Sequence, residues 1–194
     1  MRRSREDTVE TRRKIVESAS RLFRARGIAA TSVADIMGSL GLTVGGFYRH
    51  FDSKEALVVE AIDAASLETT RGHQNRSAPA GGTRRLAAML DFYLSNAHRK
   101  NAAHGCPVAA LCSEVGHETK ATKEAFTAAL QRLLAMVDTV VPRGAKERRG
   151  SLLHAASTAV GALVLARATS NEELADELLT AARKSLLDEQ SRQL

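Results

Sequence analysis

The chain has 194 residues, 44% of them hydrophobic, a size that supports one core with a small satellite and excludes two large independent domains. Two cysteines and no apolar leader near Met1 argue against a disulfide framework and a secretory signal, so we expect a cytoplasmic protein. The first 54 residues carry 11 basic and six acidic side chains, hence +5 of the net +6, which is typical of a polyanion-binding head or of a solvated basic arm.

Apolar residues recur at helical spacing along the chain, and no run alternates as a strand would, so we predict an all-α fold. Gly27 is placed to end the first helix, and residues 142–144 to interrupt the chain after the seventh. The apolar stretch 155–168 is too short to cross a bilayer, so no membrane partner is expected. About nine helices are expected, over residues 8–26, 33–40, 43–51, from Ser53 to a loop at 72–83, then 84–100, 107–116, 120–141, 145–168 and 171–190.

Residues 32–51 have the pattern of a helix-turn-helix. Ser32 and Asp35 can form a capping box at the start of the second helix. Gly41 supplies a tight turn, and Thr43 can cap the helix that follows. Two short helices joined by a glycine-containing turn predict a helix-turn-helix, which places its second helix in the major groove of DNA.

The helix 43–51 carries the residues expected to touch double-stranded DNA. Its first residues, Thr43 to Gly46, are placed to read base edges, because the N-terminal end of a recognition helix enters the major groove. Side chains that donate hydrogen bonds suit the phosphates, and these are Tyr48, Arg49, His50 and Lys54. The alternative is that the aromatic residues of this helix only fill a small core.

The sequence from Phe47 to Leu57 resembles the TetR family of transcriptional regulators, in which an aromatic-Tyr-x-His-Phe string precedes x-Ser-Lys-Glu-x-Leu. The resemblance implies phosphate contacts by Thr43, Tyr48, His50 and Lys54, and a base-reading surface at Val44, Gly45, Gly46 and Phe47. One departure matters, because Gly45 and Gly46 replace the larger side chains of many relatives. Direct readout is then expected to depend on Thr43, Val44 and a close approach of the backbone.

The same resemblance divides the chain into a DNA-binding domain, residues 1–57, and an effector-sensing and dimerisation domain, residues 58–194. It implies a homodimeric repressor that is released from a palindromic operator by a small-molecule or thiol-reactive effector. One helix-turn-helix buries little surface, which also favours two-fold binding. The last two helices are expected to form the dimer interface, with an internal hairpin as the alternative; the interface residues are Leu153, Ala156, Ser157, Val160, Leu163, Val164, Arg167, Leu174, Leu178 and Ala181.

Cys106 is a candidate sensor. Pro107 favours the first position of a helix, so Cys106 is expected at the N-cap, where the helix dipole stabilises a thiolate. His104 and Arg99 are near in sequence and can add positive charge. The resemblance to a subset of TetR-like repressors with a Gly-Cys step at this place implies a response to electrophiles or oxidants. The alternative is that Cys106 is a plain cap residue and Cys112 a core filler.

An organic ligand held in the helical body is the more usual effector in this family. Its expected walls, if these residues are not plain core, are Met89, Phe92, Tyr93, Leu111, Phe126, Leu130, Leu133 and Met136. The sequence contains no zinc spacing, cofactor loop or catalytic triad, so no metal, cofactor or enzyme activity is expected. Two other functions stay open: a nonspecific or architectural DNA-binding protein, and a thiol-based redox enzyme built on Cys106.

Overall fold

The computed structural model describes residues 5–76, 83–140 and 148–192. Within these ranges the chain is all-α, as predicted, with one short 3-10 helix (η1) and no strand. The elements are α1 (Arg5–Arg26), α2 (Val33–Gly38), α3 (Val44–Phe47), α4 (Lys54–Arg76), α5 (Thr83–Tyr93), α6 (Asn96–Lys100), η1 (Ala102–His104), α7 (Pro107–Val115), α8 (Lys120–Asp138), α9 (Arg148–Ala168) and α10 (Glu172–Arg192).

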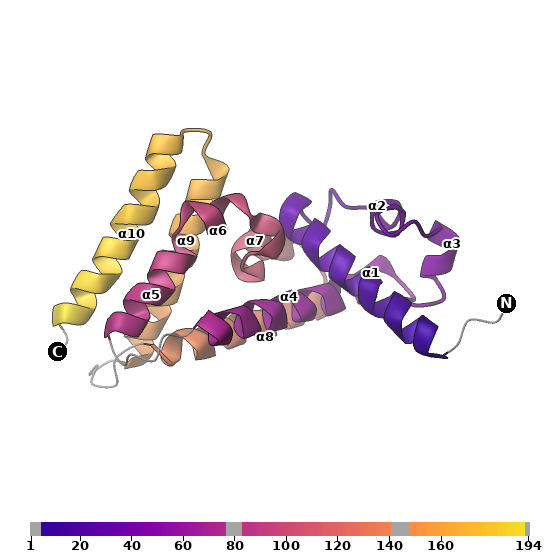
Figure 1. Cartoon of the computed structure of the whole chain (residues 1–194), viewed down its shortest axis with the longest axis horizontal. Coiled ribbons are helices and arrows are strands. Elements are labelled where there is room, and N and C mark those ends of the chain that lie inside the picture. Colours follow the sequence, from indigo (N-terminus) through magenta and orange to yellow (C-terminus); the bar gives the residue numbers. More distant parts are fainter. Residues whose placement is uncertain (1–4, 77–82, 141–147, 193–194) are drawn as a thin grey trace.

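The first three helices form a head at one end of the molecule (Figure 1). α2 begins at the predicted capping box: the Ser32 hydroxyl accepts the N–H of Asp35 at 3.1 Å, and the Asp35 carboxylate accepts the N–H of Ser32 at 2.8 Å. Gly27 and Gly41 have φ of +91° and +66°, in the left-handed region that glycine tolerates best. Both predicted glycine turns are therefore confirmed.

Two helices of the head are shorter than expected. α2 ends at Gly38, and α3 is a single turn, after which the chain continues in turns, with the N–H of His50 donating to the Phe47 carbonyl at 2.8 Å. Thr43 occupies the N-cap position, but its side chain makes no capping hydrogen bond, so the predicted cap by its hydroxyl is wrong. Consecutive glycines explain the short helix, since glycine loses the most backbone entropy on entering one.

α4 joins the head to the body and runs beside α8 (Figure 1). Its predicted N-cap is confirmed, because the Ser53 hydroxyl accepts the N–H of Ala56 at 3.0 Å. The helix continues to Arg76, which corrects the expected start of a loop at residue 72. The rest of that loop up to residue 82, and the expected break at 142–144, lie outside the described residues.

The helix predicted over 84–100 is in fact two helices, α5 and α6. Ser95 separates them with an extended backbone, and its hydroxyl accepts the N–H of His98 at 3.1 Å to cap α6. The chain then passes through η1 into α7, which begins with Cys106 at the N-cap and Pro107 in the first turn, as predicted. These short elements bring residues 93–106 to one side of the body.

α9 and α10 pack against each other at the end of the molecule far from the head (Figure 1). α9 is long and apolar enough to cross a membrane by length and composition alone, with a mean hydropathy of 1.3. However, 44% of that apolar window is buried inside the protein, and the core helices of globular proteins show the same composition. Leu163 and Ala166 of α9 are fully buried, so this helix supplies much of the core of the body.

Candidate DNA interface and effector cavity

The recognition helix α3 presents an open face at its N-terminal end. Thr43, Val44 and Gly45 are exposed, and Gly46 is half-buried. A Cβ added to Gly45 meets nothing within 4 Å, and one added to Gly46 makes only ordinary contacts of 3.7 Å with Met37 and Thr43. The head therefore has room for larger side chains here, and the bare surface permits a close approach of DNA.

Phe47 does not belong to this open face. Its side chain is 0% exposed, its ring stacks on Phe51 with centroids 5.5 Å apart, and it meets Tyr48 edge-on at 5.2 Å. The prediction that Phe47 contributes to the base-reading surface is wrong, because this side of α3 closes the apolar core of the head.

The side chains predicted to contact phosphates lie at the C-terminal end of α3 and the start of α4. Tyr48 is 65% exposed, Arg49 is exposed and His50 is half-buried. Lys54 differs from them, because its ammonium donates to the Ile28 carbonyl at 2.6 Å and so ties α4 to the turn after α1. A contact of Lys54 with DNA has to use its remaining donors.

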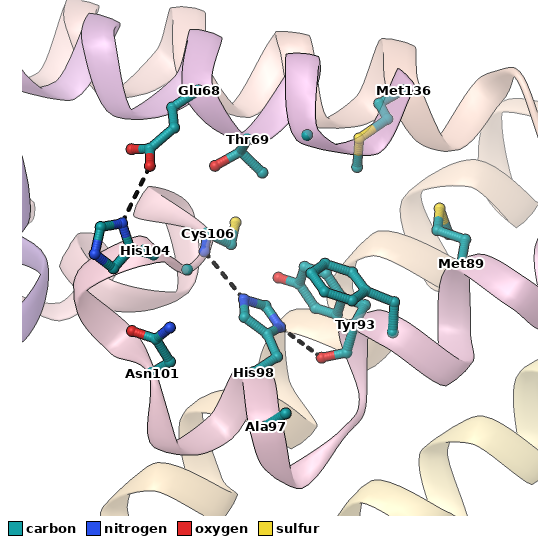
Figure 2. A pocket seen from close by; sticks show the side chains of 13 residues that line it. Glu68, Thr69, Met89, Tyr93, Ala97, His98, Asn101, His104, Cys106 and Met136 are labelled. Atoms are coloured by element: carbon teal, nitrogen blue, oxygen red, sulfur yellow. Dashed lines mark hydrogen bonds and ion pairs between the residues drawn. The ribbon is translucent and has the colours of Figure 1, made fainter. Parts of the chain in front are cut away.

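A cavity of about 350 Å³ lies between α4, the segment from α5 to α7, and α8 (Figure 2). Four of the predicted wall residues line it, namely Met89, Phe92, Tyr93 and Met136. The other four do not: Leu111 is buried in the core, Leu133 lines two smaller hollows, and Phe126 and Leu130 pack against the core. The sequence did not single out most of the polar lining, which includes Glu68, Thr69, His98, Asn101 and His104.

Cys106 lines the cavity at the start of α7 and is 1% exposed. Its backbone N–H donates to Nε2 of His98 at 3.2 Å, and Nδ1 of His98 lies 2.7 Å from the Tyr93 carbonyl oxygen (Figure 2). Because Nε2 accepts and Nδ1 must donate to a carbonyl, His98 is neutral and carries its proton on Nδ1. One amide at the start of α7 is therefore already occupied by His98.

The positive charges expected beside Cys106 are turned elsewhere. His104 lies 3.2 Å from the Glu68 carboxylate, and Arg99 pairs with Glu172 at 2.5 Å. Neither cation is held against the thiol, so the expected electrostatic support from these two residues is wrong. Both had seemed close only because they are near Cys106 in sequence.

Arg167 of α9 is the cation that approaches the thiol. Its guanidinium donates to the carbonyls of His98 at 2.9 Å and Arg99 at 3.2 Å, which caps the end of α6. Burial lowers the pKa of Arg167, and the neighbouring Tyr93 and Cys106 work in the opposite direction. Its Nη1 is buried with no hydrogen-bond partner among the described residues. The prediction that Arg167 faces a second protomer is wrong, because the side chain points into its own body.

Tyr93 brings a second unmet donor to the same place. Its hydroxyl is directed toward Cys106 (Figure 2) and is buried without a hydrogen-bond partner in the part of the chain that the structure describes. Burial, and to a lesser extent the Cys106 thiol, raises the pKa of Tyr93 well above its usual range, so the phenol stays a donor. A buried hydroxyl with no acceptor costs about 1–3 kcal/mol.

Hydrogen bonds connect the cavity wall to α1 of the head. The buried guanidinium of Arg24 donates to the Gly105 carbonyl at 2.9 Å and to the Glu68 carboxylate at 2.5 Å, and both partners line the cavity. At the other end of α7, Glu114 accepts the N–H of Ala29 at 3.0 Å. A displacement of α7 must therefore disturb contacts with the head.

The outer side of α9 and α10 carries exposed apolar residues. Leu153, Leu174, Ser157 and Ala181 are exposed, and Val160, Val164 and Leu178 are half-buried. Two of the predicted interface residues, Ala156 and Leu163, are instead buried within the protomer. Their assignment to the interface is wrong, since the small and apolar residues of α9 cover two faces and these two lie on the inner one.

A helix-turn-helix head that is hydrogen bonded to a helical body with a cavity defines a class of DNA-binding regulatory proteins. Residues 15–61 match the family model described as bacterial regulatory proteins, tetR family, and residues 82–182 match the tetracyclin repressor-like, C-terminal domain. The chain belongs to the TetR family of DNA-binding transcriptional regulators.

Individual relatives agree with this assignment. The chain is 40% identical over 97 residues to the HTH-type transcriptional regulator TtgR of Pseudomonas putida, an alignment that spans 46% of this chain and 45% of TtgR. A TetR transcriptional regulator from Chloroflexus aurantiacus has a TM-score of 0.77 at 27% identity, over 94% of this chain and 95% of that one. The reduced form of NemR from E. coli has a TM-score of 0.76 at 18% identity, over 91% and 95%, and supports the fold alone.

Proposed function

We propose that the protein is a homodimeric repressor that binds a palindromic operator and leaves it when an effector acts at the cavity. The observation that carries this proposal is the hydrogen bond from Arg24 of the head to Gly105 at the cavity wall. An effector that prefers a displaced wall shifts the population toward a different head orientation. We assign residues 1–57 to DNA binding and residues 58–194 to effector sensing and dimerisation, with action in the cytoplasm.

Operator recognition is assigned to the open face of α3. Thr43, Val44, Gly45 and Gly46 read base edges, while Tyr48, Arg49, His50 and Lys54 hold phosphates. The exposure of Val44, Gly45 and Tyr48 supports this assignment, since the burial of Phe47 turns them outward. Phosphate contacts release counterions, so operator affinity should fall steeply with salt.

Dimerisation is assigned to the outer side of α9 and α10. The exposed Leu153 and Leu174 and the half-buried Val160, Val164 and Leu178 provide an apolar surface there. A two-fold pair of heads matches two half-sites spaced by about one helical turn of DNA, roughly 34 Å.

The effector acts in the cavity, either as a bound small molecule or as a reagent that modifies Cys106. In the covalent route the Cys106 sulfur adds to one alkene carbon of an electrophile such as N-ethylmaleimide, and the thiol proton ends on the other alkene carbon. The adduct adds bulk directly beside Gly105, which Arg24 holds. The covalent route is supported by the place of Cys106 in the cavity wall.

A selection of bound DNA from a randomised library tests this proposal. We expect a short palindrome, which wild type loses after treatment with N-ethylmaleimide. Cys112→Ser is the matched control and should respond as wild type does, whereas Cys106→Ser should keep its DNA. A pool without a shared motif would indicate nonspecific binding. Equal release of wild type and Cys106→Ser would remove the sensor role of Cys106 and leave operator recognition intact.

A further inference from the structure

The cavity combines apolar walls with two unmet donors at one end. Met89, Phe92 and Met136 supply aromatic and thioether surface, which suits a flat apolar ring. The Tyr93 hydroxyl and Nη1 of Arg167 are both buried without a partner among the described residues. Such groups usually find acceptors in folded proteins, so this end of the cavity is built for an acceptor that the chain does not supply.

The charges around the cavity favour an anionic acceptor. Arg167 is a buried cation next to Tyr93 and Cys106, and its guanidinium reaches the edge of Gly105 in the cavity wall. The opposing charge is Glu68, which already pairs with Arg24 at 2.5 Å and with His104 at 3.2 Å. The net field at the end with Tyr93 and Arg167 is therefore positive.

We propose that the cavity binds a compact aromatic carboxylate, with its ring against Met89, Phe92 and Met136 and its carboxylate accepting from Tyr93 and Arg167. A carboxylate offers two acceptor oxygens and a negative charge, which matches two donors of which one is a cation. The volume of about 350 Å³ lies near the lower end for small-molecule sites, so one ring or two fused rings fit best. The proposal deepens the proposed function, because it names the chemical class of the effector.

Binding of 2-naphthoate, benzoate and cinnamate to the full chain in the absence of DNA tests the proposal, with calorimetry as the measurement. At least one carboxylate should bind more tightly than its primary amide, and 2-naphthylmethylamine should bind weakest. Tyr93→Phe should weaken the carboxylate roughly tenfold or more, because a hydrogen bond to a charged group is lost. The thermal midpoint of free Tyr93→Phe should not fall, since its hydroxyl has no partner to lose.

Thr127→Val is the matched control, because it removes a hydroxyl that bonds only within exposed α8. It should leave carboxylate binding unchanged. Failure of all three carboxylates at millimolar concentration, equal binding by wild type and Tyr93→Phe, or tighter binding of the amine would overturn the proposal. If an operator is recovered while the carboxylates fail, only this inference falls. A carboxylate that binds without affecting the operator complex would confirm the site and refute its effector role.

Discussion

Gly105 occupies a position where a side chain has no room. A Cβ there would lie 2.7 Å from Nη2 of Arg167 and 2.9 Å from Nε2 of His98. The backbone at Gly105 is extended and open to any residue, so packing alone excludes a larger side chain. Gly105→Ala should therefore lower the free energy of unfolding by about 1–3 kcal/mol, measured by urea denaturation.

Gly38→Ala is the control for Gly105→Ala, because a Cβ on Gly38 meets nothing within 4 Å. It replaces glycine by alanine within α2 and should raise stability by up to about 1 kcal/mol. Equal stability of the two variants would mean that His98 and Arg167 can move without cost, which would contradict a firmly held wall at Cys106.

Glu68 should make stability depend on pH in acid. Burial works to raise the pKa of Glu68, but the hydrogen bond and charge of Arg24, helped by His104, outweigh it, and the pKa lies below its ordinary 4.5. A carboxyl with a lowered folded pKa stabilises the protein above its unfolded pKa, and this stability is lost as pH falls through the folded value. Wild type should therefore lose stability below about pH 4.5 more steeply than Glu68→Gln.

Urea midpoints measured across the acid range check this prediction for Glu68. Near neutral pH, Glu68→Gln should be the less stable protein, because Arg24 then keeps a neutral partner in place of a charged one. The two stabilities should converge as the pH falls. Parallel curves for the two proteins would show that Glu68 is not the group responsible.

At the scale of elements, the parts set by neighbouring residues were predictable. The capping box of α2, the glycine turns and the Pro107 start of α7 each need only a few adjacent residues to form. The break at Ser95 was not predictable, because helical spacing continues through Leu94 and Asn96 and no glycine or proline marks it. Serine caps a helix only where the chain has already turned, and here tertiary packing decides the turn.

The contacts that define the candidate site depend on residues far apart in sequence. Arg24 and Gly105 are 81 positions apart, and the spacing of apolar residues says nothing about such a pair. Arg167 fitted an outward stripe on α9 by spacing, yet it caps α6 in its own body. The sequence therefore located the reading helix and half of the cavity walls, while the polar end of the cavity needed the tertiary structure.

α3 yields a prediction of its own, because its glycines are not required by the fold. Gly45→Ala adds a methyl group where nothing lies within 4 Å, so stability should hold or rise by up to about 1 kcal/mol. The same methyl group stands on the proposed reading face and should weaken operator binding about tenfold, as one mismatched base pair does. Thermal melting and fluorescence anisotropy measure the two effects. Unchanged affinity would mean that the start of α3 does not approach DNA.

At the scale of the whole molecule, one protomer offers a single short reading helix. The head is fixed to its own body through Arg24 and Glu114, so the spacing between two heads depends on how two bodies meet. An effector that moves α7 can then act on operator affinity without touching DNA, because it changes the distance between heads. Dimerisation is thus the step that converts a local displacement into loss of binding.

The outer side of α9 and α10 is testable by placing a charge on it. Leu174 and Leu67 are similarly exposed in the protomer, at 43% and 37%, but only Leu174 lies on the proposed dimer surface. Leu174→Asp should give a monomer by light scattering, because an unpaired carboxylate in an apolar interface is costly, and operator affinity should fall about a hundredfold or more. Leu67→Asp should remain a dimer with wild-type affinity. A dimeric Leu174→Asp, or a monomer that binds the operator as tightly as wild type, would contradict the proposed assembly.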